Sequence, residues 1–232
     1  GETVQVTDER YQWLANPTWS PDGTRVVCVK FYYTERSMGS GELWEYDVAE
    51  FLRTREIQRG TRLVGRTSSD SQIGPEEPAY AADGSVFFSL NRRDESGGVW
   101  QYNKDPHAGI YEIRRVHNGQ VSTVAGGYGG AARPQPSPNG DLLAFVRRVK
   151  FDTALVLRRL STGEERIVSR DLALDQQEAS ATSGVYPGFA WSDDSSRIFV
   201  SLKNGHIAQL DVSKVFEPNA AAPIPTLLQL RL

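Results

Sequence analysis

Runs of β-branched and aromatic residues recur along this chain, and each run follows a short turn sequence. In the first case the tetrapeptide Ser-Pro-Asp-Gly at 20–23 precedes the run Val26–Tyr33. Proline has no main-chain N–H and glycine accepts the positive φ of a tight turn, so this tetrapeptide favours a turn between two strands. The succession occurs four times, with turns at Gly23, Gly84, Gly140 and Ser195 and following runs at 26–33, 86–90, 142–146 and 198–202.

The turns are 61, 56 and 55 residues apart, and each is followed by two further strand-like runs. With the short strand before each turn, every unit then has four strands. Units of about 40–60 residues with four antiparallel strands are typical of β-propeller blades. The sequence therefore predicts an all-β fold, a β-propeller of four-stranded antiparallel blades, with four blades in this chain. The further runs lie at 42–48, 110–116, 154–160 and 206–212, and at 61–66, 120–126, 165–169 and 226–230.

The predicted blades belong to a single propeller segment that occupies residues 1–232. Residues 1–8 are expected to be the outer strand of a preceding blade or of the blade that closes the ring. The blades themselves extend over about 16–66, 78–126, 134–169 and 188–230.

Other features of the repeat have simple structural interpretations. Residues 47–56 are compatible with one or two turns of helix. Aspartates recur at the turn positions, where their side chains are expected to hydrogen-bond to their own turn: Asp22, Asp83 and Asp194. Large aromatic residues precede three of the turns and are expected to pack between blades: Trp19, Tyr80 and Trp191.

The composition is that of an ordinary globular protein, with 39% hydrophobic and 24% charged residues among 232. The net charge of −3 gives no electrostatic basis for binding nucleic acid or an anionic membrane. No apolar run approaches the roughly 18 residues of a membrane helix, and no signal peptide is evident. Because the sequence begins at Gly1, a processed form could have lost one, so the compartment stays unknown. The single cysteine, Cys28, allows no internal disulfide and is expected to be buried and unreactive.

The sequence contains no pattern that predicts catalysis. The glycine-rich stretch at 127–132 formally fits a dinucleotide fingerprint, but Arg133 and Pro134 follow where that site needs a helix. Ser40 lies near glycines without the surrounding motif of a nucleophilic serine. The three histidines lie far apart and form no metal-binding pattern: His107, His117 and His206. We therefore expect no catalytic residue, no metal and no cofactor in this chain.

The turn of the type Trp-Ser-Pro-Asp-Gly and its following strand resemble the repeats of TolB-like β-propellers. Longer stretches narrow this resemblance to the propeller part of bacterial proteins that fuse TolB-like repeats to a metal-dependent amidohydrolase domain. The similarity covers the chain from about Val4 to Val212. It is carried by NPTWSPDGTRVV, RSMGSGELWEY, QYNKDPHAGIYEIRRV, PSPNGDLLAFVRRV and QQEASATSGVYPGFAWSDDS.

This resemblance implies a larger ring of the six-bladed type, with further blades before this segment, a catalytic barrel after it, and a periplasmic or secreted location. The chain itself contains neither the barrel nor a His-x-His pair, so it resembles the accessory part of such an enzyme. Four blades with six-bladed curvature leave an open arc. Apolar end faces and unpaired strands would then favour a homodimer or docking on further blades of the same precursor. The rival arrangement is a compact four-bladed ring in which Val4–Thr7 completes the fourth blade.

Strands alternate in direction within a blade, so the loops between second and third strands share one face with the loops between blades. These are the long loops, at 34–41, 91–109, 127–138 and 170–187. Long loops gathered on one face are the usual binding region of repeat proteins, which predicts a partner-binding face there. The candidate contacts are Arg36, Trp100, Tyr102, Asn103, Asp105, His107, Arg133, Gln177, Glu178 and Tyr186.

Three functions fit these observations. The first is a non-catalytic binding or scaffold module, resembling the propeller of TolB–amidohydrolase proteins, with a protein or peptide as its partner and neither nucleic acid nor membrane insertion. The second is an accessory propeller that gates the active site of a peptidase or hydrolase domain absent from this chain. The third is a free-standing TolB-like interaction module.

Overall fold

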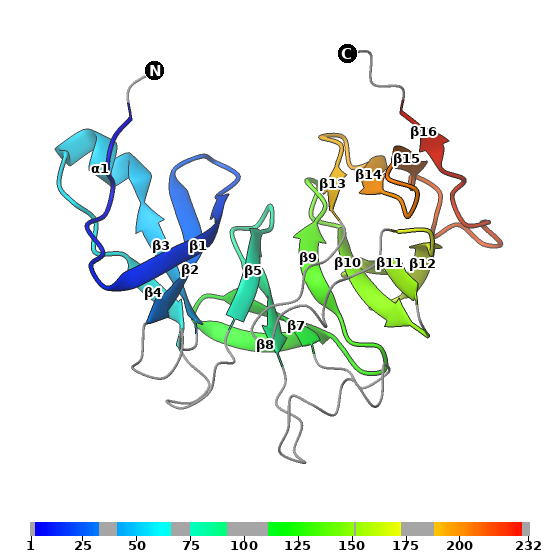
Figure 1. Ribbon diagram of the computed structural model, residues 1–232, viewed down its shortest axis with the longest axis horizontal. Coiled ribbons are helices and arrows are strands. Elements are labelled where there is room, and N and C mark those ends of the chain that lie inside the picture. The colour runs from blue at the N-terminus through cyan, green and yellow to red at the C-terminus, as the bar shows by residue number, and fades with distance from the viewer. Residues whose placement is uncertain are drawn as a thin grey trace.

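Four antiparallel sheets of four strands each follow one another along the chain in the computed structural model (Figure 1). The structure describes residues 3–32, 41–65, 75–91, 111–150, 152–172 and 188–228. In every sheet the neighbouring strands are consecutive in sequence, so each sheet is a meander of hairpins. The predicted all-β fold of four-stranded antiparallel blades, four in this chain, is confirmed.

The strands fall where the turn signals and apolar runs indicate. The first sheet contains β1 (Gln12–Trp19), β2 (Arg25–Tyr32), β3 (Gly41–Asp47) and β4 (Thr61–Val64). The second contains β5 (Pro75–Tyr80), β6 (Val86–Asn91), β7 (Tyr111–His117) and β8 (Gln120–Ala125). The third contains β9 (Ala132–Pro136), β10 (Leu142–Val149), β11 (Asp152–Arg159) and β12 (Glu165–Ser169). The fourth contains β13 (Phe189–Trp191), β14 (Arg197–Ser201), β15 (Ile207–Asp211) and β16 (Thr226–Leu227).

A short helix, α1 (Val48–Thr54), lies between β3 and β4, within the stretch that is compatible with helix in the sequence. The carboxylate of Asp47 accepts a hydrogen bond from the main-chain nitrogen of Glu50 at 2.7 Å and so caps the first turn. Arg55 ends the helix in the left-handed conformation, with φ of 60°. Within the described ranges, no helix is long and apolar enough to cross a membrane.

The aspartates of the turns hold the chain reversal between the first two strands of a sheet. The carboxylate of Asp22 accepts hydrogen bonds from the main-chain nitrogen of Thr24 at 3.0 Å and from its hydroxyl at 2.7 Å. Hydrogen bonds from Ser20 and Thr24 lower the pKa of Asp22 to about 2. Asp83 and Asp194 accept equivalent bonds within their own turns. The structural role predicted for these aspartates is confirmed.

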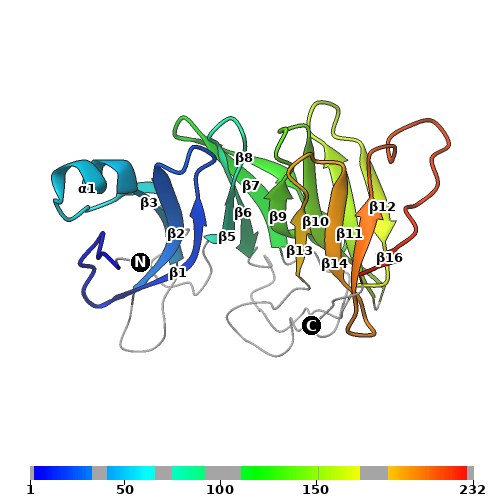
Figure 2. The ribbon, with the colours of Figure 1, turned by 90° about the horizontal axis from the view of Figure 1, so that it is seen from above.

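Successive sheets pack face to face, and their first strands lie on the inner side of an arc (Figures 1 and 2). The first and second sheets meet through a cluster that includes Val29, Leu43 and Phe88, all fully buried. The second meets the third around Phe87 and Phe145. A larger cluster of buried residues joins the third sheet to the fourth. Strand alternation explains these interfaces, because every second residue of each middle strand points toward the neighbouring sheet.

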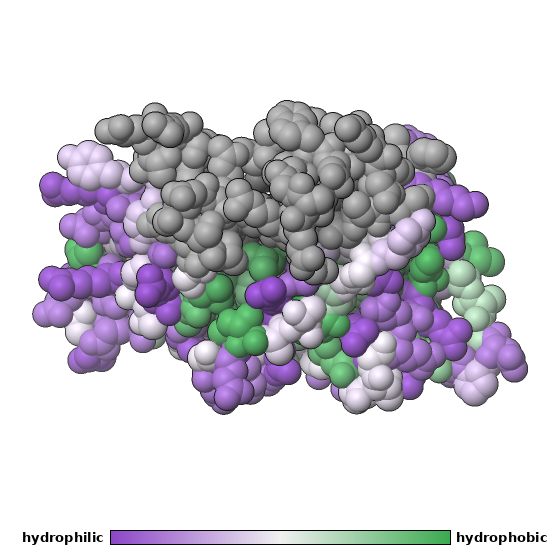
Figure 3. Space-filling view, turned by 90° about the horizontal axis from the view of Figure 1, so that it is seen from below, coloured by the Kyte–Doolittle hydropathy of each residue, from purple (hydrophilic) through white to green (hydrophobic). Residues whose placement is uncertain are grey.

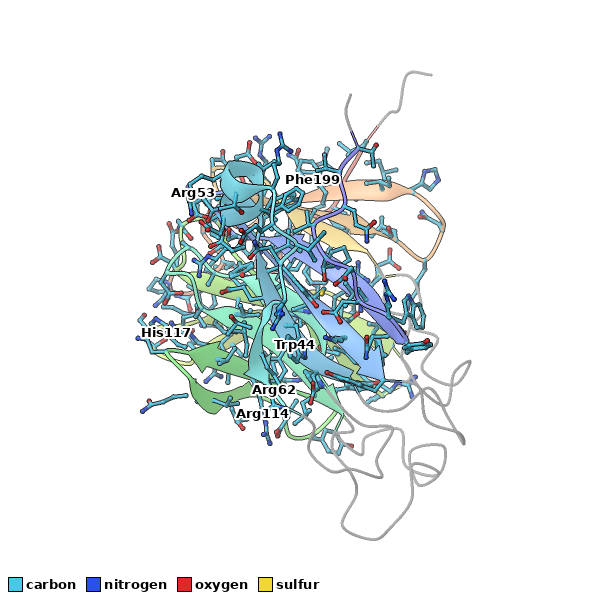
Figure 4. The ribbon with its side chains drawn as sticks, turned by 90° about the vertical axis from the view of Figure 1, so that its left-hand side faces the viewer. Trp44, Arg53, Arg62, Arg114, His117 and Phe199 are labelled. Atoms are coloured by element: carbon cyan, nitrogen blue, oxygen red, sulfur yellow. The ribbon has the colours of Figure 1, made fainter. Side chains whose placement is uncertain are left out.

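The outward face of the first sheet combines buried charged groups with aromatic side chains and is not a purely apolar surface. Lys30 is only 6% exposed, and its ammonium lies 2.7 Å from the carboxylate of Glu9. The same carboxylate accepts a hydrogen bond from the Tyr46 hydroxyl at 2.7 Å. Figure 4 looks onto this face, on which Trp44 and Arg62 are labelled. The expectation of an apolar end face is wrong here, because the segment at 3–10 brings the Glu9 carboxylate onto this face. That segment belongs to none of the four sheets.

The outward face of the fourth sheet is mixed. Phe199 is half-buried there and Ile207 is exposed, while Gln209 and Asp211 add polar groups from the same face of β15. The fourth strand of this sheet is β16, so Val4–Thr7 does not complete the fourth blade. The compact ring closed by that segment is therefore wrong.

Candidate functional site: a groove along the inner strands

The first strands of the sheets line a cavity of about 620 Å³ on the inner side of the arc. Its walls come from β1, β5 and β9, from the turns that follow them, and from Trp191 of β13. Four separate sheets therefore contribute to one cavity. Such a concave site built from several elements is the kind of surface on which ligands bind. We refer to it as the inner groove.

Three residues at equivalent positions bend the inner strands. Asn16, Glu77 and Arg133 have φ of 51°, 50° and 55°, and each is followed by a proline. Positive φ is uncommon for residues other than glycine and costs on the order of 1–2 kcal/mol. A register shift accompanies the bend in all three sheets. All three residues line the inner groove, so the repeated strain lies at a concave surface, as is frequent at functional sites.

Glu77 and Arg133 are the acidic and basic residues that line the inner groove, and Ser89 of β6 is buried behind them. The Ser89 hydroxyl donates a hydrogen bond to the Glu77 carboxylate at 3.1 Å and accepts one from the main-chain nitrogen of Arg133 at 2.9 Å. Burial raises the pKa of Glu77, while the nearby Arg133 guanidinium opposes that rise. This network links the second sheet to the third and brings a carboxyl group and a guanidinium group to the wall of the groove.

A second carboxyl, that of Glu76, is buried next to this network without lining the inner groove. Glu76 is 8% exposed, and burial, with the neighbouring Glu77 carboxylate as a smaller contribution, raises its pKa to about 8. A carboxyl with that pKa holds its proton at neutral pH much of the time. The protonation state of the Glu76 carboxyl therefore changes with pH in the physiological range.

Aromatic residues line the part of the groove near the Asp-Gly turns. The Tyr80 hydroxyl donates to the carboxylate of Glu45 in the first sheet at 2.5 Å, and the Trp191 indole donates to the carbonyl of Gln135 in the third sheet at 2.9 Å. The predicted packing between sheets is confirmed for these two. It is wrong for Trp19, which is 58% exposed and presents its indole to the groove.

Prolines determine how the groove can make contacts. Proline lacks the N–H that a strand needs for pairing, so the inner strands cannot readily accept a further strand along this edge. A ligand would be held by side chains and by van der Waals contact. The prolines that line the groove are Pro17, Pro21, Pro78, Pro134, Pro136 and Pro138.

Among the contacts predicted from the sequence, Arg133 lines the inner groove. Asn16, Glu77 and Trp19 were not among the contacts predicted from the sequence. The signal that could have found the first two is the repeated pair of a polar residue and proline before each of the first three turns, in Asn-Pro, Glu-Pro and Arg-Pro. The other candidates lie outside the described residues: Arg36, Trp100, Tyr102, Asn103, Asp105, His107, Gln177, Glu178 and Tyr186.

The one cysteine is buried, and the described residues form no metal-binding group. Cys28 is buried, as expected, and burial raises the pKa of its thiol to about 12, so it is not a reactive thiolate at neutral pH. In the part of the chain that the structure describes, no three histidine, cysteine, aspartate or glutamate side chains are grouped as a metal site would require.

Comparison with known proteins gives a match at the level of fold. No family model and no curated protein matches the chain. TolB from Acinetobacter baumannii aligns over 90% of this chain with a TM-score of 0.57 and 17% identity. A putative TolB from Agrobacterium tumefaciens aligns over 89% with a TM-score of 0.59 and 11% identity. The chain has the fold of a TolB-like β-propeller.

The same propeller fold extends to a different kind of protein. A prolyl endopeptidase structure aligns over 94% of this chain with a TM-score of 0.57 and 14% identity. The chain spans 43% and 65% of the two TolB structures and 29% of the prolyl endopeptidase. At these identities the similarity establishes the TolB-like propeller fold but not the function of this chain.

Proposed function

We propose that this chain is a non-catalytic β-propeller module that binds a protein or peptide partner in its inner groove. The observation that carries the proposal is the composition of that groove. A cavity of about 620 Å³ combines the exposed indole of Trp19 with the polar side chains of Glu77 and Arg133. Exposed tryptophan and arginine side chains are the residues most often found as anchors of protein interfaces.

The shape of the groove favours a segment of polypeptide over a compact small molecule. Its lining residues come from β1, β5, β9 and β13, so it follows the inner side of the whole arc. The Trp19 indole and the proline rings offer apolar contact near the turns, and Glu77 and Arg133 offer hydrogen bonds toward the other end of the inner strands. An extended peptide with an apolar residue and a polar or charged residue a few positions apart would meet both.

A peptide selection tests this proposal. We would pan a phage-displayed library of random heptapeptides on the immobilised chain and measure Kd for the synthesised peptides. Trp19→Ala is expected to weaken binding at least about tenfold, which corresponds to 1.4 kcal/mol. Glu77→Gln should alter the preference for basic residues in the recovered peptides. Tyr11→Ala is the matched control, because Tyr11 is exposed, does not line the groove and lies in none of the long loops.

The long-loop face is the competing location for the same function. If Arg36→Ala and Tyr102→Ala weaken the selected peptides while Trp19→Ala does not, the partner binds that face and the inner groove is the wrong site. Equal affinity of all variants would contradict both locations. Thermal unfolding of each variant shows whether it remains folded.

The second candidate function is that of an accessory propeller beside a catalytic domain on another part of a longer protein or on another chain. The alignment with a prolyl endopeptidase, of which this chain spans 29%, favours it, as does the sequence resemblance to TolB–amidohydrolase proteins. In that case the chain alone hydrolyses neither amides nor esters. Hydrolysis that persists after metal chelation and repurification would contradict both functions.

A further inference from the structure

The outer strands of the four sheets differ in how their free edges are protected. On β4 the guanidinium of Arg62 pairs with Glu42 at 3.4 Å, and on β12 the carboxylate of Glu165 pairs with Arg147 at 2.6 Å. β16 has only two residues. Charged side chains and short length are common means by which edge strands avoid pairing with other chains. β8 has neither, because its six residues, Gln-Val-Ser-Thr-Val-Ala, include no charged side chain.

The edge of β8 is also accessible. Its first four residues are exposed, and 43% of the Val121 surface is accessible. Figure 3 views the molecule from the side on which β7 and β8 lie in Figure 1, and apolar side chains are visible on that side among polar ones. Val121, Ser122, Thr123 and Val124 form a run with high β-propensity.

The hairpin that joins β7 to β8 determines which main-chain groups point outward. Asn118 and Gly119 both have positive φ, at 49° and 77°, which is the conformation of a two-residue type I′ turn. In such a hairpin His117 and Gln120 form the hydrogen-bonded pair next to the turn. Pairing alternates along the strand, so Gln120 and Ser122 bond to β7 while Val121 and Thr123 turn their N–H and C=O groups away from it.

The outward N–H and C=O groups of Val121 and Thr123 determine what kind of partner can pair with β8. Two residues with parallel N–H and C=O groups, about 6.8 Å apart, match the hydrogen-bonding repeat of an antiparallel strand. Val121 would favour a β-branched or aromatic residue opposite it. The adjoining guanidinium groups of Arg114 and Arg115 are already paired with Glu112 and Asp83, so the edge selects for extended shape and not for charge.

The size of the edge favours a flexible segment over a second folded copy of this chain as its occupant. A stable interface between folded proteins buries about 1,200–2,000 Å², far more than a pair of six-residue strands can supply. A flexible segment needs no such area, because only the few residues that pair must become ordered. From these observations we infer that β8 is a second binding surface, independent of the inner groove, that takes up an extended uncharged segment of a partner protein as a fifth antiparallel strand.

Amide hydrogen exchange on the intact chain tests this site. The probe is the capped peptide acetyl-Thr-Val-Thr-Val-Thr-amide, and its matched control has proline in place of the central threonine. At millimolar probe, exchange of the Val121 and Thr123 amides is expected to slow at least threefold, whereas the control peptide should leave them unchanged. No slowing, or equal slowing at β4 and β12, would overturn the inference.

A variant of the edge provides the second arm. Thr123→Pro removes an outward N–H that takes no part in the pairing with β7, so the sheet should survive while probe affinity falls at least fivefold. If this variant unfolds, Thr123→Lys replaces it, since a charged side chain on the edge also opposes strand addition. Unchanged probe affinity in a folded variant would show that the probe does not pair with β8.

Discussion

The hydroxyl of Ser195 accepts a hydrogen bond from the main-chain nitrogen of Asn139 at 3.0 Å, which joins the turn of the fourth sheet to that of the third. Ser195 is buried and has φ of 61°, at the position where the other three turns have glycine. In sequence, the missing glycine suggests a weaker turn. The structure shows that the serine side chain instead provides a contact between sheets that glycine cannot make.

Substitutions of Ser195 should separate the backbone strain from the hydrogen bond. Ser195→Ala keeps the left-handed strain and leaves the Asn139 N–H without its acceptor, so we expect a loss of about 1–2 kcal/mol in the free energy of unfolding. Ser195→Gly loses the same acceptor but relieves about 1 kcal/mol of strain, so its loss should be smaller. Urea denaturation measures both. Equal losses would show that strain is unimportant here, and no loss in either variant would show that the hydrogen bond does not stabilise the fold.

Much of this fold was predictable because propeller strands are encoded locally. The run at Val86–Leu90 falls within β6, and the aspartate turns hold their own backbone, so neither needs information from distant residues. The alternation of buried residues in the middle strands follows from the pleat. The buried charge of Lys30 was not predictable, because its neutralisation depends on Glu9, far away in the sequence.

The inner groove was harder to predict than the strands. A residue before proline is expected to be extended, so the sequence did not indicate that Glu77 and Arg133 adopt positive φ. Trp19 has the same place in its repeat as Tyr80 and Trp191, but a neighbouring sheet covers only the latter two. Exposure of Trp19 is thus a property of the arc and not of its local sequence.

The buried carboxyl of Glu76 should make stability depend on pH. Its pKa is about 8 in the folded protein, compared with an ordinary value of 4.5. Between these values the folded state retains a proton that the unfolded chain has released, so the stability from this group is present below about pH 4.5 and is lost as pH rises toward 8. The slope is at most about 1.4 kcal/mol per pH unit.

Glu76→Gln tests this dependence, since glutamine mimics the protonated carboxyl at all pH values. Urea denaturation at pH 5.5 and pH 8 should show that the wild-type chain loses more stability over this interval than the variant does. Glu77 also titrates with a raised pKa and is present in both proteins, so the difference between them reports Glu76 together with its coupling to Glu77. The same pH dependence in both proteins would mean that Glu76 titrates normally.

The contact of Lys30 with Glu9 should stabilise the first sheet. The ammonium of Lys30 is buried against the Trp44 ring, 4.0 Å from its centroid, and Glu9 is its carboxylate partner at 2.7 Å. Glu9→Gln removes the countercharge, and an uncompensated buried charge costs about 3–5 kcal/mol. The expected result is a large fall in the urea midpoint. Combining Glu9→Gln with Lys30→Met should recover most of the loss, because no buried charge then remains unpaired.

An exposed ion pair on α1 serves as the control for this experiment. Glu50 and Arg53 are three residues apart, with 42% and 71% of their side chains exposed, so Glu50→Gln should change the free energy of unfolding by less than about 1 kcal/mol. If Glu9→Gln behaves like Glu50→Gln, the segment at 3–10 does not hold the outward face of the first sheet in solution.

Alanine substitutions of two glycines before β9 should separate the cost of a backbone conformation from the cost of a steric clash. Gly127 and Gly129 have φ of 83° and 79°, but a Cβ atom at Gly127 would meet nothing within 4 Å, whereas one at Gly129 would lie 2.1 Å from the carbonyl oxygen of Arg148. Gly127→Ala should therefore cost only about 1–2 kcal/mol, the price of a left-handed alanine. Gly129→Ala must also displace the β10 backbone, to which the Gly129 carbonyl is hydrogen-bonded at 3.0 Å through the Arg148 N–H. Its urea midpoint should fall clearly below that of Gly127→Ala, and equal midpoints would contradict the close approach of this loop to the third sheet.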